Sequence, residues 1–231
     1  MTTNKEPKKK QIPLELPFTD AMEADNFLMT ECNKEAVLWI QKWPDWQHMG
    51  LVISGKPGTG KTHLMKLWLN LSEGKKLTKQ ELLEKSSMEI TKDCLHIAID
   101  NADTIAKDNK AEEKLFHLFN YLKEKQGSLL LTFKEEIPMI PFQLPDLSSR
   151  LLTLPVARLG DPDDVLLEAL IIKQFHDRQI SLDEGVLSFL ITHIPRDAAS
   201  VRSIIDKLDT ESLTEQKKIS IRLAKRVLTE Q

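Results

Sequence analysis

The feature that most constrains the fold of this sequence is a glycine-rich loop between two apolar segments. The loop reads Gly55-Lys56-Pro57-Gly58-Thr59-Gly60-Lys61-Thr62 and satisfies the pattern G-x-x-x-x-G-K-[ST] at every position. The apolar residues 51–54 predict a buried strand before the loop, and residues 61–71 predict a helix after it. This order predicts an α/β domain with a parallel sheet, in which the loop binds phosphate groups.

Each residue type in this loop has a chemical reason. Glycines let backbone N–H groups approach phosphate oxygens closely, and the positive end of the following helix faces the same anion. We expect Lys61 to reach the β- and γ-phosphates. We expect Thr62 to hold Mg²⁺ through its hydroxyl, because this small, hard cation prefers oxygen ligands. The predicted cofactors are therefore ADP or ATP together with Mg²⁺.

A second apolar strand, predicted at 95–99, ends at Asp100. The carboxyl edge of an open α/β sheet is where ligands bind, so Asp100 should orient the water shell of Mg²⁺. The next residue is Asn101, which cannot accept a proton from an attacking water, and we therefore expect the chain alone to hydrolyse ATP poorly. Asp103 either substitutes for the missing acid or is an ordinary helix-start residue.

Strand and helix patterns alternate up to about residue 157, including a helix with apolar positions Leu115, Leu118, Phe119 and Leu122. Further strands are predicted at 128–133 and, more weakly, in a short run at 152–156. Beyond Gly160-Asp161-Pro162 every pattern is helical, with helices predicted at 163–178, 183–193, 197–208 and 221–228. We therefore predict a flexible tail at 1–19, an α/β P-loop domain at 20–157 and a small all-helical domain at 158–231.

Three arginines are candidates for contacts with phosphate. Arg150 follows the last large strand and would point toward a nucleotide held by another subunit, where a guanidinium stabilises the transferring phosphoryl group. Arg196 and Arg202 lie at the start and in the middle of a predicted helix in the helical region. Either of these two lies over the bound phosphates or is a plain surface residue.

Composition excludes several classes of protein. The chain has 32 Lys and Arg against 35 Asp and Glu, a net charge of −3, so it has no global attraction to nucleic acid or acidic membranes. A C-terminal basic cluster at Lys217, Lys218, Arg222, Lys225 and Arg226 fits a solvated helix face better than a nucleic-acid site. Two separated cysteines and the absence of an apolar leader predict a cytoplasmic protein that does not associate with membranes.

The motifs together resemble the AAA+ ATPases of the DnaA family, and within it the short regulatory members that lack the DNA-reading domain. Besides the loop, the resemblance rests on Gln11-Ile12-Pro13-Leu14-Glu15-Leu16, Asn26-Phe27-Leu28, Ile99-Asp100-Asn101, the segment 145–151 and Asp161-Pro162-Asp163-Asp164. DnaA itself usually carries two acidic residues at the place of Asp100 and Asn101. Because no helix-turn-helix domain follows the helical region, we expect no autonomous recognition of an origin.

The resemblance implies a negative regulator of replication initiation that joins the DNA sliding clamp and promotes hydrolysis of ATP bound to DnaA. It makes Arg150 the arginine finger and implies contact with DNA only indirectly or weakly, while assembly of the chain with itself stays open. It implies an extended clamp-binding peptide that uses Gln11, Ile12, Pro13, Leu14 and Leu16. It adds to the nucleotide site the residues Phe27, Leu28, Thr132 and Arg196, with Arg202 as the second choice for the lid arginine.

Two alternatives share the same loop. A helicase-loader-like AAA+ ATPase would bind a replicative helicase in place of the clamp. A P-loop kinase would transfer phosphate to a small molecule, but it would need an acceptor pocket and would leave the peptide at 11–16 unexplained.

Overall fold

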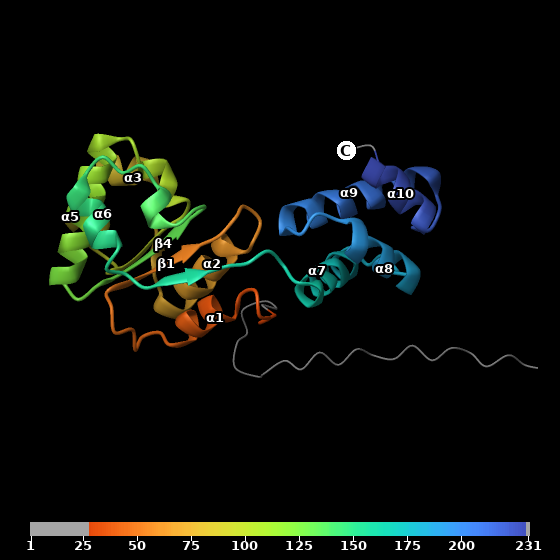
Figure 1. Ribbon diagram of the computed structural model, residues 1–231, viewed down its shortest axis with the longest axis horizontal. Coiled ribbons are helices and arrows are strands. Elements are labelled where there is room, and N and C mark those ends of the chain that lie inside the picture. The colour runs from red at the N-terminus through yellow and green to blue at the C-terminus, as the bar shows by residue number, and fades with distance from the viewer. Residues whose placement is uncertain (1–27, 230–231) are drawn as a thin grey trace, which may run out of the picture.

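The computed structural model describes residues 28–229, which form two lobes arranged along the longest axis of the molecule (Figure 1). We call residues 28–158 the base and residues 164–229 the lid. A short connection, residues 159–163, joins them. The last strand of the base ends at Arg158.

The base is built on a parallel sheet with the strand order β2-β3-β4-β1-β5. Every residue of the two central strands β1 and β4 is buried, which explains their continuous apolar sequences. In the register of these strands Ile53 lies opposite Thr132, so both strands end at the same edge of the sheet. The strands are β1 Gly50–Ser54, β2 Lys75–Lys76, β3 His96–Ile99, β4 Ser128–Phe133 and β5 Val156–Arg158.

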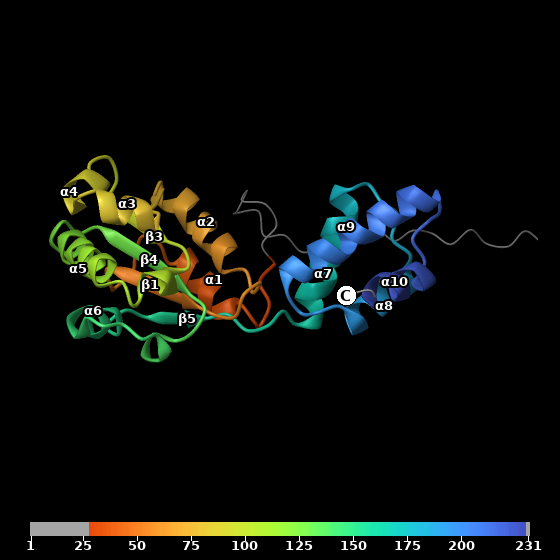
Figure 2. The same cartoon turned by 90° about the horizontal axis from the view of Figure 1, so that it is seen from above.

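Helices cover both faces of the sheet (Figure 2). Alternate strand residues supply two cores, because neighbouring side chains on a strand point to opposite faces. Leu51 and Ile53 pack with α1 and α2, whereas Val52 packs on the other face with α3, α5 and α6. The helices and 3₁₀ turns of the base are α1 Lys34–Gln41, α2 Lys61–Ser72, α3 Lys79–Glu84, α4 Ser87–Ile90, η1 Ala102–Ile105, α5 Asn109–Glu124, η2 Ile137–Met139 and α6 Pro145–Leu151.

The lid has its own apolar core, in which Leu167, Phe175, Leu190 and Ile204 are buried. Aspartates begin three of its helices: the side chains of Asp163, Asp183 and Asp197 accept hydrogen bonds from backbone N–H groups of the first turns. The lid helices are α7 Asp164–Asp177, α8 Glu184–His193, α9 Ala198–Glu215 and α10 Ile221–Thr229.

A buried carboxylate, Glu112 on α5, fixes the segment that leads into α6. Glu112 is fully buried and accepts hydrogen bonds from the backbone N–H groups of Lys107 (2.9 Å), Gln143 (2.8 and 3.1 Å) and Leu144 (2.7 Å). Leu144 is the residue immediately before α6. The start of α6 is therefore tied to α5 through one side chain.

The structure confirms the predicted fold class, a parallel P-loop sheet followed by an all-helical unit. The strand predicted at 152–156 is wrong in position: α6 ends at Leu151, residue 152 caps it, and β5 begins only at Val156. The helix predicted at 197–208 continues to Glu215. Within residues 28–229, no helix is long and apolar enough to cross a membrane.

Candidate nucleotide-binding site

The glycine-rich loop connects β1 to α2 in a conformation that only glycine adopts easily. Gly58 has φ +81° and Gly60 has φ +99°, both in the left-handed region. Gly60 directly precedes α2 and has no side chain with which to cap the helix. The N-terminus of α2 therefore presents its backbone N–H groups and the positive end of its dipole to the loop, as a phosphate-binding loop requires.

Lys61 lies inside this loop and is almost fully buried, with 6% of its surface exposed. Its Nζ donates hydrogen bonds to the carbonyl oxygens of Gly55 and Lys56, both at 2.6 Å. Burial lowers the pKa of Lys61 below its ordinary value, while the negative charges of Asp103 and Asp100 partly offset this effect. The ammonium group is thus held where the loop would receive a phosphate.

Asp100 and Thr62 are brought together across the sheet edge, as the sequence predicts. The Thr62 hydroxyl donates to Asp100 Oδ2 at 3.0 Å, and the hydroxyl of the fully buried Thr132 donates to Asp100 Oδ1 at 2.7 Å. A third donor is Lys76 on β2, whose Nζ lies 3.2 Å from Asp100 Oδ2. Burial raises the pKa of Asp100, but these three hydrogen bonds outweigh burial and hold its pKa below the ordinary value.

The donor set at this edge fits Mg²⁺. A threonine hydroxyl and a carboxylate lie within hydrogen-bonding distance of each other beside the loop, and both are oxygen ligands. Among the described residues no group of three or more His, Cys, Asp or Glu side chains is placed to hold a metal ion. Any Mg²⁺ at this site would therefore depend on the phosphates of the nucleotide for most of the negative charge around it.

The residue after Asp100 is Asn101, which adopts a left-handed backbone conformation with φ 50°. Its backbone N–H donates to the Thr132 hydroxyl at 2.8 Å. Asp103 accepts a hydrogen bond from the backbone N–H of Lys134 through Oδ1, while its Oδ2 is buried and makes no hydrogen bond. The acid next to Asp100 is thus absent, and the nearest replacement, Asp103, acts on Lys61 through its charge.

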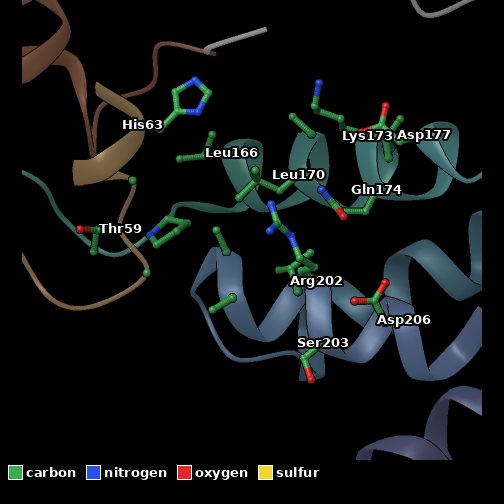
Figure 3. Close-up of a pocket in the computed structure, with 18 of the residues that line it drawn as sticks. Thr59, His63, Leu166, Leu170, Lys173, Gln174, Asp177, Arg202, Ser203 and Asp206 are labelled. Atoms are coloured by element: carbon green, nitrogen blue, oxygen red, sulfur yellow. The ribbon is translucent and has the colours of Figure 1, made fainter. Parts of the chain in front are cut away.

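The lid closes one side of the loop to form an open cleft of about 1740 Å³. The backbone N–H of Ala198, the first residue of α9, donates to the Gly58 carbonyl oxygen at 3.1 Å. Figure 3 shows Thr59 of the loop on one side of this cleft and Leu166, Leu170 and Arg202 of the lid on the other. The cleft lining also includes Leu28, one of the two residues predicted to lie beside the adenine. The other, Phe27, lies outside the described residues, as does the whole predicted clamp-binding peptide from Gln11 to Leu16.

The two candidate lid arginines take different positions in the structure. Arg196 precedes α9 and is not in the cleft lining; it forms an ion pair with Asp164 and donates to the Pro162 carbonyl oxygen at 3.2 Å. Arg202 does line the cleft and projects from α9 toward α7 (Figure 3). Sequence spacing missed this difference because it depends on how α9 crosses α7, and these two helices meet only in the folded lid.

Arg150 lies far from this cleft, in the last turn of α6, at the end of the base that faces away from the lid (Figures 1 and 2). Its guanidinium lies over the ring of Phe116 at 5.7 Å from the centroid. None of the ion pairs within residues 28–229 includes Arg150. The sequence places Arg150 after a strand, but only the structure shows that a helix holds it at the far end of the base.

A P-loop sheet of this strand order followed by a separate helical lid is the fold of AAA+ proteins, and the described part of this chain has that fold. Within that class, residues 163–228 match the family described as Hda, lid domain. Domain III of the replication initiation protein DnaA from Thermotoga maritima has a TM-score of 0.78 and 22% identity, covering 88% of this chain and 94% of that one. AMPPCP-bound DnaA from Aquifex aeolicus has a TM-score of 0.69 and 15% identity, covering 81% of this chain and 65% of that one.

A relative from Haemophilus influenzae, an uncharacterized protein, is 25% identical over 234 residues, which span 95% of this chain and 98% of that protein. The lid of this chain is thus similar to the lid of Hda, and its fold is the AAA+ fold of DnaA. The predicted resemblance is confirmed at this level: residues 163–228 are similar to the lid domain of Hda, and the fold is similar to that of DnaA domain III.

Proposed function

We propose that this chain is a nucleotide-bound regulator that docks on the DNA sliding clamp and stimulates hydrolysis of the ATP held by DnaA, and that it thereby limits initiation of chromosomal replication. The position of Arg150 carries this proposal. It is a guanidinium with no carboxylate partner in the described part of the chain, and α6 holds it at the end of the base opposite the chain's own cleft. A guanidinium at that end of the base is remote from the chain's own cleft, and this supports a role at the nucleotide of another subunit.

The chain's own site supports binding better than hydrolysis. Lys61 and the loop N–H groups would hold the phosphates of ADP or ATP, and Arg202, rather than Arg196, would contact them from the lid. Thr62 and Asp100 would hold Mg²⁺, Asp100 through water, and the metal would neutralise phosphate charge. Because Asn101 replaces the acid that would position an attacking water, we propose that the nucleotide here serves as a structural ligand.

The adenine nucleotide is proposed from the DnaA relatives, whose structures contain AMPPCP. Leu28 at the cleft, together with Phe27, would lie beside the base, and Thr132 would position Asp100. We propose a cytoplasmic protein whose contact with DNA is indirect, through the clamp and DnaA.

An arginine finger acts at the transition state, and its removal from comparable systems lowers the hydrolysis rate by about 10³–10⁵. The test is hydrolysis of radiolabelled ATP by DnaA in the presence of DNA-loaded clamp, with wild type, Arg150→Ala or Arg222→Ala. Arg222 is an exposed arginine of the lid and is the matched control. We expect wild type and Arg222→Ala to accelerate hydrolysis, and Arg150→Ala to bind clamp and ADP normally without accelerating it.

Full acceleration by Arg150→Ala would show that another residue is the finger. No acceleration by the wild type would leave the nucleotide site intact but refute the regulatory role. In that case, recovery of a replicative helicase with the chain would indicate a loader, and ATP turnover that needs a small-molecule acceptor would indicate a kinase.

Clamp docking is tested separately with the double variant Gln11→Ala, Leu14→Ala. Alternating anchors of an extended peptide fill pockets on a partner, so removal of two of them should abolish clamp binding in a pull-down while ADP binding stays unchanged. Undiminished clamp binding would show that residues 11–16 are only a linker.

A further inference from the structure

Lys76 is a positive charge at the metal end of the nucleotide site that the phosphate-binding loop motif does not contain. It is the last residue of β2, on the strand next to β3, and its backbone pairs with Ala98, two residues before Asp100. Its Nζ lies 3.2 Å from Asp100 Oδ2, the same oxygen that accepts the Thr62 hydroxyl at 3.0 Å. The ammonium therefore shares an acceptor with the residue that the loop offers to Mg²⁺.

Asp100 is the only carboxylate in direct contact with Thr62 among the described residues, and its side chain is only 9% exposed. A nearly buried carboxylate beside a phosphate site repels the phosphates unless a cation balances it. Lys61 acts on Asp100 only through space, because its Nζ donates its hydrogen bonds to the loop carbonyl oxygens of Gly55 and Lys56. Lys76, which is 47% exposed and reaches Asp100 from solvent, is the side chain that does.

We infer that Lys76 is a built-in cation of the nucleotide site, which balances Asp100 and allows the chain to bind a nucleoside diphosphate without Mg²⁺. The inference rests on the proposed nucleotide binding and adds to it the ionic condition under which binding occurs. Lys76 acts through Asp100 and is a positioning residue. Mg²⁺ and the Lys76 ammonium would both balance the negative charge of Asp100. The presence of one cation should therefore reduce the gain in nucleotide affinity that the other provides.

The test measures the affinity for a fluorescent ADP analogue with two proteins, wild type and Lys76→Met, each in two conditions, Mg²⁺ and EDTA. The full chain is used throughout. Wild type should lose less than about threefold in affinity when Mg²⁺ is removed, whereas Lys76→Met should lose roughly tenfold or more, since a hydrogen bond to a charged group is lost. In Mg²⁺, Lys76→Met should bind ADP as tightly as wild type or more tightly.

Lys75→Met is the matched control, because the neighbouring side chain on a strand points to the opposite face of the sheet. In Lys75→Met the affinity for ADP should depend on Mg²⁺ as little as in wild type. Lys76→Arg, which keeps the positive charge, should also show the small Mg²⁺ dependence of wild type. Thermal unfolding without nucleotide, followed by tryptophan fluorescence, checks that every variant is folded.

The same Mg²⁺ dependence in wild type and Lys76→Met would overturn the role of Lys76 and leave the nucleotide site standing. Absence of ADP binding by wild type in both conditions would overturn the nucleotide site itself, and the role of Lys76 with it.

Discussion

Replacement of the buried Glu112 by Gln tests whether one side chain holds the arginine-bearing helix in place. The carboxylate of Glu112 accepts hydrogen bonds from the backbone N–H groups of Lys107, Gln143 and Leu144. Glutamine has nearly the same shape but only one acceptor oxygen, and its amide group donates. If the oxygen keeps the place of Oε1, the Leu144 N–H faces an NH₂ group and loses its acceptor.

The expected cost follows from these contacts. The Leu144 N–H loses its hydrogen bond, and the Gln143 N–H keeps only the longer of its two contacts, at 3.1 Å. The contacts that remain, from Lys107 and Gln143, change from a charged to a neutral acceptor. Hydrogen bonds to charged groups contribute roughly 1.5–3 kcal/mol each, and an unsatisfied buried donor costs about 1–3 kcal/mol. Burial of the neutral amide costs less free energy than burial of the carboxylate, and this difference offsets part of the loss. We expect Glu112→Gln to lower the free energy of unfolding of the base by about 3 kcal/mol, a large fraction of the 5–15 kcal/mol typical of a domain.

Urea unfolding followed by tryptophan fluorescence isolates the base, because the chain's four tryptophans, Trp39, Trp43, Trp46 and Trp68, all lie in it. Glu113→Gln, at the exposed neighbouring position, is the control and should change the free energy by less than about 0.5 kcal/mol. A loss below about 1 kcal/mol for Glu112→Gln, with an unchanged dependence on urea, would refute the reasoning. Under conditions in which the variant is folded, stimulation of DnaA should still fall, because residue 144 begins the segment that positions Arg150.

Three further outcomes follow from the described contacts. The pKa of Glu81 is lowered to about 2 by hydrogen bonds from a lysine side chain and a threonine N–H; its stabilisation is therefore complete above its ordinary pKa of 4.5 and is lost as the pH falls toward 2. In Glu81→Gln, the free energy of unfolding should fall less steeply between pH 4.5 and 2 than in wild type. The difference should be no more than about 1 kcal/mol, since the group is near the surface, and an identical dependence on pH would contradict this. Gly58→Ala should weaken ADP binding, because the new Cβ would lie 2.6 Å from the Asp197 Cβ at a φ of +81°, whereas Gly160→Ala, where the nearest atom is 3.5 Å away, should bind normally in the same titration. Lys61→Ala should weaken ADP binding by roughly a hundredfold in calorimetry, since a charged bond to phosphate is lost, and unchanged affinity would remove Lys61 from the site.

The sequence predicts the core of the nucleotide site because the residues that form it are set by local pattern. The loop Gly55–Thr62 is contiguous, and the aspartate at the end of β3 is placed by the rule that parallel strands end at one edge. The capping box of Thr78 and Glu81 before α3 is equally local, because its two residues are three positions apart in the sequence. Periodicity likewise predicts the lid helices to within a few residues, apart from the far end of α9.

Contacts between segments distant in sequence could not be predicted in this way. Glu112 accepts hydrogen bonds from residues 31 and 32 positions away, and no local signal distinguishes Glu112 from the exposed Glu113 beside it. Lys76 reaches Asp100 only because β2 pairs with β3. Arg196 and Arg202 are likewise separated by tertiary packing, which turns the first toward Asp164 and the second into the cleft.

The segment after the N-terminal tail is attached to the rest of the molecule at the cleft. The Leu28 carbonyl accepts a hydrogen bond from the Asn33 side chain at 2.9 Å, and the Cys32 carbonyl accepts one from the backbone N–H of Gly160 in the connection to the lid. Twelve residue steps separate Leu16 from Leu28, a contour of at most about 42 Å at roughly 3.5 Å per residue. A partner that bound residues 11–16, as proposed, would stay within that distance of Leu28 at the cleft. Its local concentration there would rise without any additional contact surface.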